Sequence, residues 1–300
     1  MKYIITMTLN PCIDRTIETT SFETGKTNYV TGVRSEVGGK GINVAFALNH
    51  FGLPVLAMGF SYEKDREVLE NAMKREGVDH AFVLVEGSMR VNRKIFDTSK
   101  KCMTELNEKG ETVQASYVEL LLEELEKKLP DAQALVLTGS VPPGIDAQIY
   151  RRMAEIANRY EVPVFLDANR DLLLQGIKAT PFFIKPNQDE FFETFGCTKT
   201  DMLDKAKEIV EKGIAYVCIS LGEEGAVLVS KDKVVQRKAL PTEIASLQGA
   251  GDAMIAGICK ALYKDAAEDI LSYALAAAAA TISLPGTVMP TLQQLNEFME

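Results

Sequence analysis

The chain has 300 residues, of which 46% are apolar and 25% are charged, and its formal net charge is −9. These proportions are ordinary for a globular protein and allow one large α/β domain, alone or with a small appendage. The acidic balance argues against a nucleic-acid-binding protein, and no apolar run approaches membrane-spanning length. The five cysteines include no C-x-x-C pair, and Met1 leads directly into a predicted strand. We therefore expect a cytoplasmic protein with reduced thiols.

The predicted elements begin with a strand over Tyr3–Leu9. Thr and Val then recur at strand-like spacing in Arg15–Glu36, and further strands are predicted at Val91–Asp97 and Met103–Leu106. Such strands have no obvious place among the helices of a doubly wound sheet. We predict that they form a small separate β-sheet that acts as a lid, although they could also be edge strands of the main sheet. The apolar face of a lid would be a candidate dimer surface.

The middle and the end of the chain alternate between strand-like and helix-like segments. This pattern indicates parallel strands joined by crossover helices. The predicted strands are Ala134–Thr138, Val162–Leu166, Phe182–Lys185 and Ala215–Leu221. The predicted helices are Ile149–Tyr160, Gln188–Phe195, Met202–Lys212, Asp252–Leu262, Ala266–Leu284 and Leu292–Met299.

The strongest candidate for chemistry is Gly249-Ala250-Gly251-Asp252, which runs straight into an apolar helical pattern. A glycine turn at a helix start leaves backbone N–H groups unpaired at the positive end of the helix dipole. That geometry suits a phosphoryl group in transfer, and Asp252 could accept a proton from an attacking hydroxyl. The helix start would also keep this carboxylate ionised. The alternative is a simple helix cap.

A second glycine turn, Gly38-Gly39-Lys40-Gly41, leads into an amphipathic helix predicted over residues 42–51. Its glycines let the backbone approach a ligand, and its lysine favours an anion. Asn43 lies in the first helical turn and could bind a hydroxyl. The spacing is not that of a Walker A motif.

Two candidates for substrate contact lie near predicted strands. Asp14 is expected to project from a turn after the first strand, where its carboxylate could accept hydrogen bonds from sugar hydroxyls or stabilise its own turn. Arg90, Asn92 and Lys94 alternate, so they share one face of a strand. Arg90 could bind phosphate oxygens, or the three residues could form a solvated surface.

Three loops complete the set of candidates. Ser140 lies in a glycine- and proline-rich loop after a strand, where it could contact a substrate. Asn187 and Glu190 meet at a helix start after Lys185-Pro186, where they could organise metal-bound water or form a capping box. The segment Ser220–Ala226 is predicted to be a strand, a tight turn and another strand; its glycines would let a nucleotide lie against the backbone.

These segments in this order resemble the ribokinase-like carbohydrate kinases of the PfkB family, from Thr8 to the helix after Asp252. The T-L-N-P-x-x-D, R-V-N-x-K and K-P-N-x-x-E stretches are similar to the sugar-phosphate branch, which includes 1-phosphofructokinase and tagatose-6-phosphate kinase. The resemblance implies a doubly wound, mostly parallel α/β sheet within a single domain 1–300. A β-lid would be formed by about residues 12–36 and 90–107, and a homodimer would form through it. ATP and Mg²⁺ would be the cofactors.

The resemblance also implies a role for each candidate residue. The catalytic set would be Asp252 as base with Gly249, Ala250 and Gly251 as the anion hole. The substrate set would be Asp14, Gly38, Gly39, Lys40, Asn43, Arg90, Asn92, Lys94 and Ser140, with Arg90 on the phosphate already carried by the sugar. The nucleotide set would be Lys185, Asn187, Glu190, Ser220, Gly222 and Gly225, with Glu190 holding Mg²⁺ through water.

The expected reaction is ATP-dependent phosphorylation of a ketohexose phosphate, fructose 1-phosphate to fructose 1,6-bisphosphate. The alternatives are a kinase of tagatose 6-phosphate, of fructose 6-phosphate or of an unphosphorylated sugar, and a non-catalytic sugar-phosphate sensor. The chain departs from the family pattern in three places. Ala253 stands where serine or threonine is more usual, Gln248 stands where a small or β-branched residue is common, and the run at 99–102 is atypical of either named enzyme.

Overall fold

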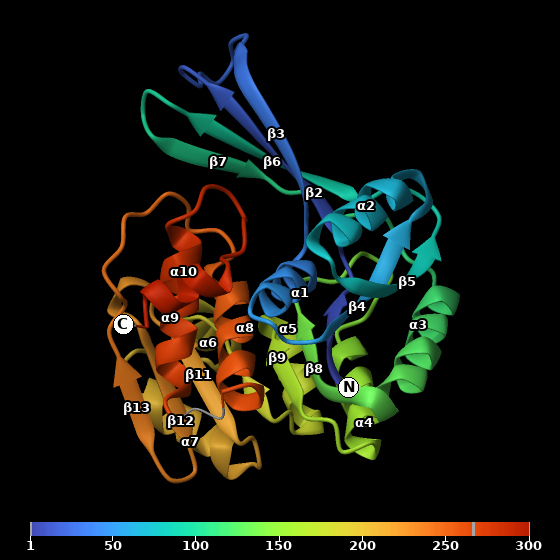
Figure 1. Ribbon diagram of the computed structural model, residues 1–300, viewed down its shortest axis with the longest axis vertical. Helices are drawn as coiled ribbons and strands as arrows, with labels where there is room; N and C mark the ends of the chain where they lie inside the picture. The colour runs from blue at the N-terminus through green and yellow to red at the C-terminus, as the bar shows by residue number, and fades with distance from the viewer. Residues whose placement is uncertain (1, 266–267, 300) are drawn as a thin grey trace.

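The computed structural model describes residues 2–265 and 268–299 and places a nine-stranded sheet among helices, with a four-stranded sheet standing off it (Figure 1). The main sheet has the order β13-β12-β11-β10-β9-β8-β1-β4-β5. Its neighbours from β11 to β5 are parallel, and β12 and β13 are antiparallel, which confirms the predicted doubly wound, mostly parallel sheet. The strands are β1 Tyr3–Thr8, β4 Val55–Tyr62, β5 Asp79–Val85, β8 Ala132–Thr138, β9 Val164–Asp167, β10 Phe183–Ile184, β11 Tyr216–Ser220, β12 Ala226–Ser230 and β13 Val234–Arg237.

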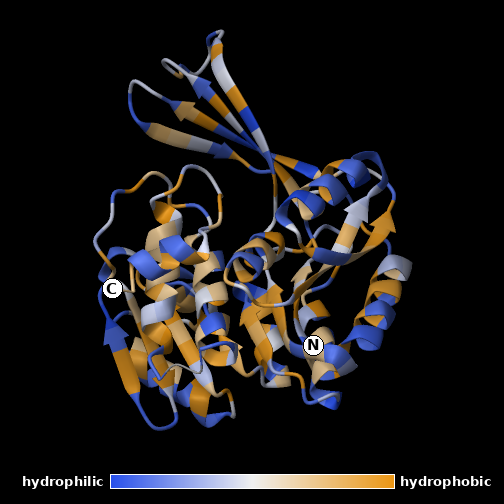
Figure 2. Cartoon of the chain, viewed as in Figure 1, coloured by the Kyte–Doolittle hydropathy of each residue, from blue (hydrophilic) through white to orange (hydrophobic). Residues whose placement is uncertain are grey.

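Helices cover the main sheet on both faces, which buries nearly every residue of the central strands β1 and β8. In Figure 2 the apolar colour concentrates on these strands and on the helices packed against them. One layer is formed by α1 Lys40–His50, α8 Ala250–Tyr263 and α9 Ile270–Ile282, which pack side by side (Figure 1). The remaining helices are α2 Arg66–Glu76, α3 Ala115–Lys128, α4 Ile149–Arg159, α5 Arg170–Gly176, α6 Gln188–Phe195, α7 Met202–Glu211 and α10 Leu292–Glu297.

The second sheet consists of β2 Cys12–Thr19, β3 Val30–Gly38, β6 Arg90–Asp97 and β7 Cys102–Leu106, in the order β3-β2-β6-β7. It shares no ladder with the main sheet in the described residues, so the predicted separate sheet is confirmed and the edge-strand alternative is wrong. We call these four strands the lid sheet. Because side chains alternate along a strand, the lid sheet has two faces of different chemistry.

The boundaries of several elements differ from those predicted. Asp14 lies within strand β2 and not in a turn, because the chain pairs with β3 and β6 from Cys12 onward. Helix α1 begins at Lys40 rather than at residue 42, so Lys40 and Gly41 of the glycine turn belong to its first turn and Gly39 is its N-cap. β9 begins after Pro163, which has no N–H to donate.

The two predicted C-terminal helices are shorter than expected. Helix α9 begins at Ile270 because Asp269 caps it by accepting a hydrogen bond from the N–H of Ser272. Residues 266–267, which the prediction included in that helix, lie outside the described residues. The last helix, α10, ends at Glu297.

Strand β1 lies where the order of the main sheet reverses, between β8 and β4. Ligands of open α/β sheets bind at the carboxyl ends of the strands beside such a point. The segments that leave this edge begin with Leu9 after β1, Gly139 after β8 and Ala168 after β9. Within residues 2–265 and 268–299, no helix combines the length and the hydropathy of a membrane span.

Candidate active site

The turn at residues 249–252, called here the anion-hole turn, begins helix α8 with bare backbone. Gly249 has φ 77°, in the left-handed region, and its N–H precedes the helix. The first helical hydrogen bond runs from the N–H of Ala253 to the carbonyl of Gly249. The N–H groups of Ala250, Gly251 and Asp252 therefore have no acceptor within the helix. They lie at the positive end of the dipole of α8, as a site for a phosphoryl group requires.

Asp252 is 5% exposed and accepts a hydrogen bond of 2.8 Å from Asn43 Nδ2 to its Oδ2. This bond brings the first turns of α1 and α8 together, so the two glycine turns lie at one site. Burial raises the pKa of Asp252 to about 6, although Lys40 and the Asn43 hydrogen bond oppose the rise. Desolvation therefore has a larger effect on this pKa than the neighbouring positive charge and the hydrogen bond. A carboxylate with this pKa is ionised at neutral pH and is a stronger base than an exposed aspartate.

Asp167, at the end of β9, is the main residue of the site that the sequence analysis missed. Its side chain is 1% exposed and lies between two lysines, with Lys40 Nζ 3.3 Å from Oδ2 and Lys185 Nζ 3.3 Å from Oδ1. Thr138 Oγ1 donates a hydrogen bond of 3.0 Å to Oδ2. Burial opposes ionisation, but the two lysines outweigh it and the pKa of Asp167 is lowered. The carboxylate in turn raises the pKa of Lys40.

The two lysines held by Asp167 join the two glycine turns. Lys40 is the first residue of α1, and its side chain is 42% exposed. Lys185 Nζ lies 3.3 Å from the position that a Cβ on Gly251 would occupy. A side chain at Gly41 would meet Met7 O at 2.3 Å, so the turn at the start of α1 needs glycine there to pack against β1. Positive charge therefore surrounds the anion-hole turn.

A polar pocket of 210 Å³ opens beside Lys40 at the carboxyl edge of the main sheet. Ser140 lines it and accepts a hydrogen bond of 3.3 Å from Asn10 Nδ2. Arg90 also lines it, and its guanidinium donates to Asn92 Oδ1 and to the carbonyls of Asn10 and Glu108. The pocket is lined by Thr8, Leu9, Asn10, Lys40, Arg90, Thr138, Gly139, Ser140, Asp167, Ala168, Asn169 and Glu190.

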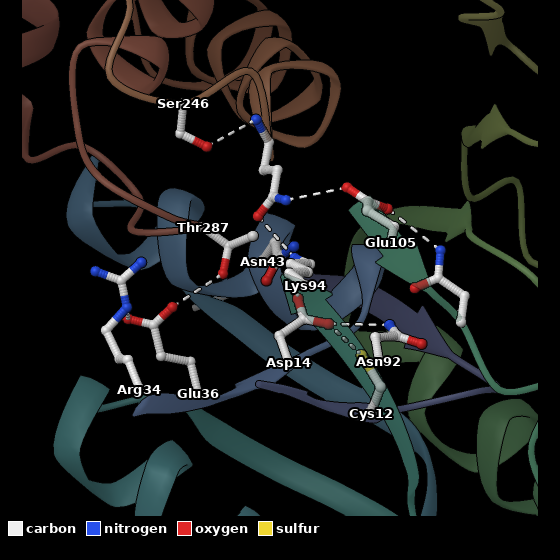
Figure 3. Close-up of polar contacts among 12 residues, drawn as sticks. Cys12, Asp14, Arg34, Glu36, Asn43, Asn92, Lys94, Glu105, Ser246 and Thr287 are labelled. Atoms are coloured by element: carbon white, nitrogen blue, oxygen red, sulfur yellow. Dashed lines mark hydrogen bonds and ion pairs between the residues drawn. The ribbon is translucent and has the colours of Figure 1, made fainter. Parts of the chain in front are cut away.

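The face of the lid sheet that looks toward the body carries Asp14, Asn92 and Lys94 (Figure 3). Asn92 Nδ2 donates to Asp14 Oδ1 at 2.9 Å, and Lys94 Nζ lies 3.0 Å from Asp14 Oδ2. Lys94 is thus a buried partner of Asp14 rather than an open cation beside Arg90. Cys12 donates to the same carboxylate at 3.4 Å, and burial raises the pKa of its thiol to about 12, which leaves it an inert thiol.

A larger, mainly apolar cleft of 560 Å³ lies on the other side of the anion-hole turn. It contains Asn187 and the predicted turn residues Ser220, Gly222 and Gly225, together with Ala250 and Gly251. Gly225 has φ 94°, and a Cβ there would meet Arg237 O at 2.0 Å, so this turn requires glycine. The exposed side chains of Ile244 and Leu247 extend the apolar wall.

The first turn of α6 separates the polar pocket from the apolar cleft. Asn187 Oδ1 accepts a hydrogen bond from Glu190 N, and Glu190 Oε2 accepts one from Asn187 N, both at 2.8 Å. The capping-box interpretation of this pair is confirmed. Glu190 also lines the polar pocket, while Asn187 lines the apolar cleft.

Comparison with known proteins identifies the family. Residues 7–294 match the model of the pfkB family carbohydrate kinases. The 1-phosphofructokinase of Vibrio cholerae is 30% identical over 100% of this chain and 95% of its own length. Phosphofructokinase-2 from Escherichia coli in complex with potassium has a TM-score of 0.93 at 26% identity, covering 99% of this chain and 98% of its own. The same enzyme in complex with fructose-6-phosphate has a TM-score of 0.89 at 25% identity with the same coverage. The chain belongs to the pfkB family of carbohydrate kinases, and it is a phosphotransferase that acts on a hydroxyl group.

Proposed function

We propose that this kinase transfers the γ-phosphoryl group of ATP to the free primary hydroxyl of fructose 1-phosphate, which gives fructose 1,6-bisphosphate and ADP. The observation that carries the proposal is the contact between Asn43 and Asp252. This contact supports the proposal because it brings the buried carboxylate of Asp252 and the anion-hole turn against the lysine-bearing start of α1, between a polar pocket and an apolar cleft. The similarity to 1-phosphofructokinases over the full length supports the choice of sugar.

Asp252 is the proposed general base. Its carboxylate takes the proton of the attacking hydroxyl while the new O–P bond forms and the bond from the γ-phosphorus to the bridging oxygen of ADP breaks. The amides of the anion-hole turn, with the ammonium group of Lys185 beside Gly251, stabilise the charge on the transferred group.

The sugar phosphate is proposed to bind between the lid sheet and the polar pocket. Arg90 and Lys40, which both line that pocket, would hold the phosphate already on the sugar. Asp14 and Asn43 would bind ring hydroxyls, with Asn92 and Ser140 at the periphery. Lys94 holds Asp14 in place. Gly38 and Gly39 would let the backbone come close to the sugar; Gly39 has φ 128°, so only glycine suits that position.

ATP is proposed to lie in the apolar cleft, with its base against the glycine turn at 222–225 and its phosphates directed to the anion-hole turn. Mg²⁺ in kinases is held by one or two carboxylates together with phosphates and water. Glu190 fits this role, since its Oε2 is fixed by the capping box and its side chain lines the pocket beside the turn. We assign Oε1 of Glu190 to a metal-bound water, and Lys185 and Asn187 to the phosphates.

The chain is proposed to be a single domain over residues 1–300 that forms a homodimer. The face of the lid sheet that points away from the body supports the dimer. Val33 is 61% exposed and Leu106 is 55% exposed on the face opposite Lys94. Ile17 and Ile95 lie on the same face and are only partly buried. Apolar residues exposed on one face, here interrupted by Arg15 and Arg93, are expected to pair with a second copy. Val33→Glu is expected to give a monomer in analytical ultracentrifugation, and an unchanged mass would contradict a lid interface.

Fructose 6-phosphate is the second candidate substrate, because the E. coli enzyme that resembles this chain over its full length was solved with that sugar phosphate. Tagatose 6-phosphate presents the same chemistry. Steady-state ADP release with each of the three sugar phosphates, and with free fructose, separates these alternatives. The proposal predicts the highest kcat/KM for fructose 1-phosphate. A higher value for fructose 6-phosphate would replace it with the second candidate.

A further inference from the structure

Gln248 joins the lid sheet to the body of the molecule. Lys94 Nζ donates a hydrogen bond of 2.7 Å to Gln248 Oε1, and Gln248 Nε2 donates one of 3.2 Å to Glu105 Oε1. Lys94 and Glu105 stand opposite each other on β6 and β7 (Figure 3). The Gln248 amide, bonded to both, therefore spans two neighbouring strands. Gln248 is one of the residues at which the chain departs from the PfkB family pattern, where a small or β-branched residue is common.

The chemistry of the three side chains fixes the orientation of the amide. An ammonium group can only donate and a carboxylate can only accept, so the Gln248 oxygen must face Lys94 and its nitrogen must face Glu105. Both bonds involve a charged partner and are therefore stronger than bonds between neutral groups. Ser246 Oγ accepts a hydrogen bond of 3.2 Å from the Gln248 N–H, which fixes the backbone at the base of the bridge.

The place of Gln248 in the chain gives this bridge its importance. The next residue is Gly249, where the anion-hole turn begins. On the lid side, Lys94 is buried and also bound to Asp14, the proposed sugar ligand. A continuous path of polar contacts therefore runs from Asp14 through Lys94 and Gln248 to the turn.

A second contact between the lid sheet and the body provides a comparison. Thr287 Oγ1 lies 3.4 Å from Glu36 Oε2 on β3 (Figure 3). Residue 287 belongs to the loop between α9 and α10, away from the anion-hole turn in sequence. This contact attaches the lid sheet without a polar path to the anion-hole turn, although Met289 of the same loop packs against Gly249.

We propose that Gln248 is a positioning residue that couples the lid sheet to the anion-hole turn, so that the sugar site and the phosphoryl site become ordered together. The inference rests on the proposed function for its consequence in catalysis. The proposal also makes a prediction for the enzyme without ligands, which is that loss of the Gln248 amide loosens both the lid strands and the anion-hole turn.

The test is amide hydrogen exchange on the full-length enzyme without ligands. In Gln248→Val, exchange within β6 and β7 and at the Ala253 N–H, which is bonded to the Gly249 carbonyl of the turn, is expected to accelerate about tenfold, the effect of losing hydrogen bonds to charged groups. Gln236→Val, on exposed strand β13, is the matched control and is expected to change neither region. Thr287→Val removes a contact that has no polar path to the turn, and it is expected to accelerate exchange in the lid strands more than at the Ala253 N–H.

Swapping the two side chains of the bridge, Gln248 and Glu105, makes the test specific. Gln248→Glu sets two carboxylates against each other and is expected to accelerate exchange in both regions. Combining it with Glu105→Gln keeps the carboxylate acceptor for Lys94 and restores a donor–acceptor pair between residues 105 and 248, at the net charge of the parent. That double variant is expected to return both regions to within about twofold of the parent rates.

Three results would overturn the proposal: no acceleration in Gln248→Val, acceleration of the lid strands with an unchanged turn, or no recovery in the exchanged double variant. If Gln248→Val does not fold, Glu105→Ala at an exposed lid position replaces it, and this variant is expected to accelerate amide exchange in both regions.

The exchange rates are measured without substrate. An enzyme that proves inactive on every sugar phosphate would therefore refute the proposed function and leave the exchange result unchanged. In active enzyme, Gln248→Val is expected to lower kcat and to raise the KM for the sugar phosphate, with the KM for ATP unchanged.

Discussion

Asn43 Nδ2 lies 2.8 Å from Asp252 Oδ2 and joins the first turn of α1 to the first turn of α8 across 209 positions of sequence. The bond holds the proposed base in a fixed orientation beside the anion-hole turn. Because Asp252 is buried, the charge of Lys40 and then this hydrogen bond are what help to keep the carboxylate ionised.

Asp252→Asn is expected to lower kcat by about 10²–10⁴-fold, because an amide cannot accept the proton of the attacking hydroxyl. Binding of the sugar phosphate, measured by calorimetry, should change little. Asp204→Asn on exposed helix α7 is the matched control and should leave kcat unchanged. A near-normal kcat in Asp252→Asn would remove this residue from the role of base.

The pH profile of kcat should report the raised pKa of Asp252. Only the ionised carboxylate accepts a proton, so kcat is expected to fall as pH decreases through about 6. Removal of the Asn43 amide takes away a hydrogen bond to the ionised form, which raises the pKa further. Asn43→Ala should therefore move the acid limb upward by about one pH unit. A limb that stays in place would show that another group titrates.

The same substitution at two buried aspartates should have opposite effects on the free energy of unfolding. The pKa of Asp252 is raised, so ionisation above pH 6 opposes folding of the parent; Asp252→Asn removes this cost, up to about 3 kcal/mol at pH 8. The pKa of Asp167 is lowered, so its ionised form stabilises the fold above the ordinary pKa of an aspartate. Asp167→Asn leaves two lysines without their counter-ion and should cost about 3–5 kcal/mol. Urea unfolding at pH 8 measures both, and destabilisation by both substitutions would contradict the assignment of Asp252.

The features of the site that the sequence predicted are local in the chain, and those that it did not predict depend on contacts between distant segments. The helix over Gln188–Phe195 was predicted with its correct bounds, because Asn187 and Glu190 form a local capping box. The anion-hole turn was predicted for the same reason, since glycine and helix signals are local in sequence. Asp167 carried no local signal beyond its place at the end of an apolar strand, and its lysine partners come from two distant segments.

The lid sheet was predicted as a separate unit, but the pairing of its side chains was not. Asp14 and Lys94 are 80 positions apart, and only the register of β2 against β6 brings them together. Gln248 stood out in the sequence as an unusual residue without an evident role. Its bridge to Lys94 and Glu105 required the position of the lid sheet relative to α8.

Arg90→Ala is expected to raise the KM for the sugar phosphate by about ten- to a hundredfold, with the KM for ATP unchanged, because charged hydrogen bonds to a phosphate are lost. Arg93→Ala is the matched control, since Arg93 lies on the other face of β6 and pairs with Glu108. Equal KM values for the two variants would show that Arg90 does not contact the sugar phosphate.

The central claim is that the glycine turn before α8 and the lysine-bearing start of α1 form a single site for phosphoryl transfer to a sugar phosphate. The most direct test is a coupled assay of ADP release over a panel of phosphorylated ketohexoses, with free fructose as the reference acceptor. The account predicts ADP release that depends on the sugar phosphate, with the highest kcat/KM for fructose 1-phosphate and little release with fructose. No stimulation of ADP release by any member of the panel would contradict it.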